Sequence, residues 1–173
     1  QHGAQPNTVR VDRMVAPDGS VSWQVFVPGT QSAQGLWGGD SPNDWASNAQ
    51  LHGRQDSAAS AAVIAAMRAA GVGADEPVLI AGHSQGGMVA ADLAAREEVR
   101  AEFQIASVLS IGAPVGHVEI PAEVATLHLE HTDDLVSGLD DQINPVTPER
   151  TTITRNVTAA SPWYQLGHVG EAH

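Results

Sequence analysis

One stretch of the sequence, residues 77–99, constrains the fold more than any other. It begins with a short apolar run at 78–81, which is typical of a buried strand. It ends in an alanine-rich run from residue 88, which is typical of a helix packed on a sheet. Between them the chain reads Gly-His-Ser-Gln-Gly (82–86), a G-x-S-x-G placed between a strand and a helix. The stretch therefore predicts a sharp strand-to-helix turn centred on Ser84.

Such a turn explains the residue types around Ser84. Gly82 and Gly86 are needed because a tight turn leaves no room for side chains two residues before and after the serine. The turn raises the Ser84 hydroxyl above the sheet edge and aims the N–H of Gln85 at the space where an acyl oxyanion would form. Because glycine and serine are also common in structural turns, the motif is specific only in this context. In this context it favours a nucleophilic serine.

The remaining pattern predicts an α/β domain. A helix is expected over 56–70, and strands are expected over 8–16, 20–27, 103–111, 124–130 and 151–157. The turn at 17–20 predicts a hairpin between the first two strands. Alternating strands and helices indicate a mostly parallel sheet flanked by helices, with chemistry at the carboxyl ends of the strands. With 173 residues, the chain is expected to form one domain spanning 1–173.

The strand predicted at 20–27 runs into Pro28-Gly29-Thr30. On its own this is an ordinary turn at a strand end. Together with Ser84 it becomes a candidate for the second half of an oxyanion hole, in which Gly29 lets the backbone approach the substrate and the Thr30 N–H donates to the oxyanion.

A long polar, glycine-rich loop is predicted next, over residues 31–55. It contains Trp37 and Trp45, whose side chains either offer apolar surface to a substrate or pack the loop against the rest of the domain. Together with Trp163, these two tryptophans suggest the hypothesis that the substrate carries an apolar acyl group.

Composition excludes several functions. The net charge of −12 argues against nucleic-acid binding, because phosphate contacts need Lys and Arg. No cysteine is present, so the chain has no disulfide and no thiolate site. No run approaches the ~20 apolar residues of a membrane span, and no signal peptide is visible, so no stable membrane insertion is expected. These features are compatible with a secreted protein and with a cytoplasmic one.

A serine nucleophile needs a base, and the base needs an orienting carboxylate. In a strand–turn–helix site of this kind, the three residues come in the chain order serine, acid, histidine. The candidate acids are Asp133 and Asp134, which follow the strand predicted at 124–130, and we favour Asp134. His168 is the preferred base, because residues on both sides of it can hold it in place. His173, the last residue, competes with it if the chain is a piece of a longer protein.

Other histidines fit structural roles better. His128 alternates with leucines on a predicted strand, His131 is expected to hydrogen-bond around the following turn, and His83 lies beside the serine as a structural donor. No cluster of histidines and carboxylates has metal-ligand spacing, so no metal or organic cofactor is expected.

Four segments together resemble the α/β-hydrolase superfamily, and within it the class 3 (fungal-type) lipases and related bacterial esterases. They are VFVPGT, GHSQGG, SIGAPVG and HTDDLV, in that order, within residues 20–136. The resemblance implies that Thr30 is an oxyanion residue, Ser84 the nucleophile of a nucleophile elbow, and Asp134 the triad acid. It also implies hydrolysis of carboxylic esters, and the short chain with no long lid helix favours a small esterase over an interfacial lipase.

The sequence therefore predicts a serine hydrolase that acts on a small ester or lipid-like substrate through an acyl-enzyme. Two alternatives remain: an inactive binding module on the same fold, and an acyltransferase that uses the same triad.

Overall fold

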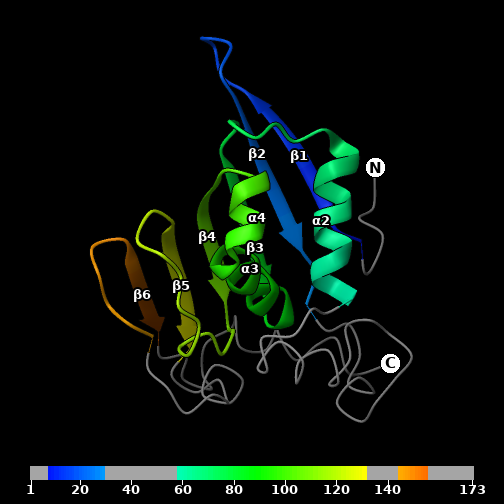
Figure 1. The fold of residues 1–173 in the computed structure, drawn as a ribbon. Helices are drawn as coiled ribbons and strands as arrows, with labels where there is room; N and C mark the ends of the chain where they lie inside the picture. Colours follow the sequence, from blue (N-terminus) through cyan, green and yellow to red (C-terminus); the bar gives the residue numbers. More distant parts are fainter. Residues whose placement is uncertain (1–7, 30–57, 132–143, 156–173) are drawn as a thin grey trace, which may run out of the picture.

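Six strands form one sheet, and their order across the sheet, β1-β2-β3-β4-β5-β6, is also their order in the chain (Figure 1). The computed structural model describes residues 8–29, 58–131 and 144–155. The hairpin partner β1 is antiparallel to β2, and every other neighbouring pair is parallel. The strands are β1 (Arg10–Val15), β2 (Val21–Val27), β3 (Val78–His83), β4 (Ile105–Ile111), β5 (Ala125–His131) and β6 (Arg150–Arg155).

The helices described here all lie on one face of the sheet, which we call the helix face (Figure 1). They are α2 (Ala58–Ala70), α3 (Gln85–Ala95) and α4 (Glu97–Glu102). The strand order gives the physical reason. Crossovers between parallel strands are right-handed, so strands that follow one another in a single direction place their connections on the same side. The protein therefore belongs to the α/β class, as the sequence predicted.

The core lies between the helix face and the helices. Trp23, Val25 and Val27 of β2 align in register with Val78, Ile80 and Gly82 of β3, and none of the apolar side chains among them is more than 7% exposed. Small residues along α3 let the helix lie close to these strands. The largest apolar side chains that α2 and α3 bury against the sheet are Val63, Met67, Met88, Val89 and Leu93.

The hairpin prediction is confirmed. The Gly19 N–H donates to the Ala16 carbonyl at 2.9 Å, and the Ala16 N–H donates to the Ser20 carbonyl at 2.9 Å. Gly19 has φ +86°, a conformation that glycine adopts without steric cost. The strand predicted at 151–157 corresponds to β6, which lies at the end of the described sheet.

The alanine-rich run after Ser84 forms a helix, as predicted, but a second helix follows it within residues 77–102. The first of them stops at Arg96, whose backbone is extended with φ −82° and ψ 118°, and α4 begins at the next residue. The break changes the direction of the chain, so that Val99 and Phe103 are 3% and 2% exposed in the core.

Candidate active site

The carboxyl ends of β2 to β6 lie along one edge of the sheet, and Ser84 lies at this edge between β3 and α3. Its backbone has φ +52° and ψ −123°. Ser84 is the one non-glycine residue with positive φ in the described ranges. Such a conformation costs on the order of 1–3 kcal/mol in an L-residue, so the surrounding structure must hold it in place.

Backbone hydrogen bonds hold Ser84 from two sides. Its N–H donates to the Ile111 carbonyl at the end of β4, at 2.8 Å. Its carbonyl accepts from the N–H groups of Gly87 at 2.9 Å and Met88 at 3.2 Å. The serine is therefore fixed to the neighbouring strand through its amide and to the first turn of α3 through its carbonyl.

The Ser84 hydroxyl does not serve the usual structural role of a serine at a helix start. An ordinary N-cap serine has an extended backbone, and its side-chain oxygen accepts a hydrogen bond from the first turn of the helix. Within the described residues, Ser84 has neither feature: its φ is positive and its side chain makes no capping bond. Ser84 is thus a half-buried residue at the sheet edge whose side chain has no capping function.

The glycines of the turn are sterically required. A Cβ on Gly82 would lie 2.2 Å from the Gly86 carbonyl carbon, and a Cβ on Gly86 would lie 2.3 Å from the Val27 carbonyl oxygen. A Cβ on Gly87 would lie 2.7 Å from the Ala113 Cβ. These contacts are with backbone or with a rigid side-chain atom, which cannot move aside. The steric reason given from the sequence for Gly82 and Gly86 is confirmed.

The end of β2 approaches the same turn. A Cβ on Gly29 would lie 2.7 Å from the His83 carbonyl oxygen, so this glycine allows the strand end to pass beside the residue that precedes Ser84. The candidate oxyanion residue Thr30 comes next in the chain and lies outside the described residues. Gln85, the other candidate, begins α3, where the first N–H groups of a helix point out of its end. Its side chain is 1% exposed.

Several predicted site residues lie outside the part of the chain that the structure describes. The strand β5 ends at the same sheet edge with His131, and the candidate acids follow two and three residues later. The structure thus brings together Ser84, Gln85 and Gly29, and it does not describe the rest of the predicted site: Thr30, Asp133, Asp134, His168, His173, Trp37, Trp45 and Trp163.

His128 has the structural role that the sequence favoured for it. Its side chain is fully buried on β5, where Nδ1 lies 2.6 Å from the Ser110 Oγ and Nε2 accepts from the Arg150 Nε at 2.9 Å. Because a guanidinium can only donate, Nε2 is unprotonated, and neutral His128 donates from Nδ1 to Ser110. Burial, and then the positive charge of Arg150, lowers the pKa of His128 to about 4.

Arg150 is the residue in this region that the sequence did not single out. It lies at the start of β6, 5% exposed, and its other guanidinium nitrogens donate to two backbone carbonyls in the loop after β4. No local pattern marks it, because its partners lie 22 to 35 residues earlier in the chain.

In the described ranges, no group of three or more histidine, aspartate or glutamate side chains could hold a metal ion. No helix in those ranges is long and apolar enough to span a bilayer. In comparisons with known proteins, no family model and no curated protein matches this chain.

Proposed function

We propose that this protein is a serine hydrolase that cleaves carboxylic esters, with Ser84 as its nucleophile in a nucleophile elbow. The observation that supports this most is the backbone of Ser84. A serine held at φ +52° at the carboxyl edge of a parallel sheet, with its hydroxyl making no capping bond among the described residues, has a strained conformation without a capping role. Strained backbone of this kind is concentrated at functional sites.

The surroundings of Ser84 fit the same reaction. The positive end of α3 begins at the next residue and would stabilise negative charge on a substrate oxygen. The Gln85 N–H belongs to this helix end, and Thr30 follows Gly29, which passes beside His83. We assign these two N–H groups to the oxyanion hole as part of the proposal.

The proposed reaction has two steps. The Ser84 Oγ attacks the ester carbonyl carbon while His168 accepts the serine proton, and the oxyanion collapses to an acyl-enzyme as His168 protonates the leaving alcohol. Water then attacks the acyl-enzyme, giving its proton to His168, and the carboxylic acid leaves with regeneration of the serine. Asp134 orients the imidazole in this scheme.

The experiment is labelling with a fluorophosphonate, read as intact mass. Wild-type protein is expected to gain one adduct, and Ser84→Ala to gain none. Ser22→Ala, which removes a serine of β2 far from this edge, is the matched control and is expected to label as wild type does. His168→Ala and Asp134→Asn are expected to slow labelling by about 10³-fold or more, since an unassisted serine hydroxyl reacts poorly.

Each outcome decides between functions. A folded wild-type protein that gains no adduct would contradict the proposal and favour a binding module on this fold. Loss of labelling in His173→Ala instead of His168→Ala would keep the proposal and move the base to the last residue. Labelling that persists in Ser84→Ala would remove Ser84 from its assigned role.

A further inference from the structure

Hydrogen bonds from Arg150 and from Ser84 reach the same stretch of chain, at the end of β4 and in the loop that follows it. We propose that Arg150 is a positioning residue for Ser84: its guanidinium fixes the segment 112–118, and that segment fixes the strained turn. The inference rests on the proposed function for its effect on reactivity, but its structural part is separately testable.

The guanidinium of Arg150 reaches three acceptors. Nη2 donates to the Val115 carbonyl and Nη1 to the Val118 carbonyl, each at 2.8 Å, while Nε donates to His128 at 2.9 Å. Hydrogen bonds from a charged donor are about twice as strong as neutral ones. The rigid fork of an arginine can hold these three acceptors together, whereas a lysine would place a single nitrogen among them.

The segment held in this way contacts the Ser84 turn directly. Ile111, its immediate predecessor, accepts the Ser84 N–H at 2.8 Å, and the Gly112 N–H donates to the Leu129 carbonyl of β5 at 2.8 Å. Ala113 packs against Gly87 so closely that a Cβ there would lie 2.7 Å from the Ala113 Cβ. A movement of the segment at Gly112 and Ala113 would therefore change the packing under the first turn of α3 and would act on the residue next to the acceptor for Ser84.

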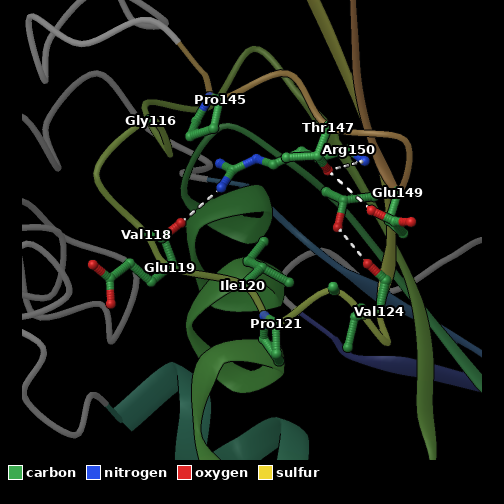
Figure 2. A pocket seen from close by; sticks show the side chains of 12 residues that line it. Gly116, Val118, Glu119, Ile120, Pro121, Val124, Pro145, Thr147, Glu149 and Arg150 are labelled. Atoms are coloured by element: carbon green, nitrogen blue, oxygen red, sulfur yellow. Dashed lines mark hydrogen bonds between the residues drawn. The ribbon is translucent and has the colours of Figure 1, made fainter.

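Packing fixes only the first part of this segment: Ala113 and Val115 are 1% exposed in the core, whereas residues 117–120 are half-buried or exposed. The crossover from β4 to β5 contains no described helix, and a cavity of about 250 Å³ lies behind it. Figure 2 shows the cavity lined on one side by the crossover, including Val118, Ile120 and Pro121, and on the other by the approach to β6. Arg150 extends between the two sides, with its guanidinium at the Val118 carbonyl (Figure 2). Without the guanidinium, the half-buried part of the crossover at Val118 would lose this bond to the start of β6.

The side chain of Ser110, on β4, also connects Arg150 with the first turn of α3. Its Cβ would be 3.1 Å from a Cβ on Gly87, and its hydroxyl pairs with His128, which in turn accepts from Arg150. The neutral state of His128 is required here, because a protonated ring would present a donor to the guanidinium. Arg150 thus acts on the turn through the backbone of the crossover and through this side-chain chain.

The test compares Arg150→Met and Arg150→Lys with wild type. Met keeps an unbranched apolar stem without donors, and Lys keeps the charge without the fork. Arg68→Met is the matched control, since it removes an exposed arginine that makes two hydrogen bonds to Glu102 away from this edge. All variants are first checked for folding by circular dichroism and urea denaturation.

Two readouts follow. The first is the fluorophosphonate reaction, in which both Arg150 variants are expected to lower the maximal labelling rate by about 10- to 100-fold, as expected for losing a charge-assisted hydrogen bond, with the half-saturating probe concentration unchanged. The second is amide hydrogen exchange by NMR, in which the Ser84 and Gly112 amides are expected to lose protection by a similar factor. The Val63 amide in α2 reports whether the whole domain has loosened instead.

The outcomes separate this inference from the proposed function. If wild-type protein does not label, the proposed function fails, and the exchange at Ser84 and Gly112 still tests the positioning role. If the Arg150 variants label at the wild-type rate, or if Ser84 loses no more protection than Val63, the positioning role is wrong while the proposed function stands.

Discussion

The strained backbone of Ser84 leads to a prediction about stability that runs opposite to the usual effect of glycine. We compare Ser84→Gly with Ser84→Ala. Both variants remove the hydroxyl, so neither can form an acyl-enzyme, and the comparison isolates the backbone. Ser84→Gly is expected to be the more stable of the two, because glycine adopts φ +52° without the clash that a Cβ makes there.

The magnitude follows from two opposing contributions. Relief of an unfavourable φ and ψ pair in an L-residue contributes about 1–3 kcal/mol. Glycine loses more conformational freedom on folding than alanine does, which costs about 0.5–1 kcal/mol. The difference leaves Ser84→Gly more stable by about 1 kcal/mol. For a chain of 173 residues, this corresponds to a melting temperature about 2–4 °C higher.

The assay is thermal and urea denaturation of the two variants side by side. Ser22 of β2 provides the control, since its φ is not in the positive range. There, glycine is expected to be less stable than alanine by about 0.5–1 kcal/mol. The reasoning is refuted if Ser84→Gly is no more stable than Ser84→Ala while the Ser22 pair behaves as expected.

Two further predictions concern the core beneath this edge. The pKa of His128 is about 4 in the folded protein, below its ordinary value of about 6.5, so its contribution to stability is fully present above pH 6.5 and falls by at most about 3 kcal/mol as the pH is lowered toward 4. In His128→Gln, urea denaturation at several pH values should show a free energy of unfolding that lacks this fall. The same fall in the variant as in wild type would contradict the assignment. Gly86→Ala places a Cβ 2.3 Å from the Val27 carbonyl oxygen and should cost about 3 kcal/mol in urea denaturation. Gly71→Ala, where the Cβ meets open space, should cost only the backbone strain of about 1 kcal/mol, and equal losses at both glycines would show that the close approach is not rigid.

Much of the fold was predictable because its signals are local. Apolar runs bounded by glycine or proline marked the strands, and each described strand agrees with its predicted range to within two residues. The turn before Ser20 marked the hairpin, and the spacing around Ser84 marked a strand–turn–helix unit. Each signal depends on residues within a few positions of one another, where sterics and backbone preferences act directly.

The break at Arg96 was not predictable in the same way. Residues 88–102 contain no proline or glycine, so local preference alone favours a continuous helix. The chain is broken there because Val99 and Phe103 are buried against the core, and that gain depends on the position of the sheet. Tertiary packing decided this boundary over helix propensity.

The sequence by itself determined that this chain has a sharp turn at Ser84, which glycines on both sides make possible. Only the tertiary structure decided the strained φ of Ser84, the acceptor of its N–H at Ile111, and the place of Arg150 behind the crossover. The physical reason is distance along the chain. Arg150 donates hydrogen bonds to carbonyls 32 and 35 residues earlier in the chain. A short sequence pattern does not predict such a contact, because the contact forms only once the strands have paired.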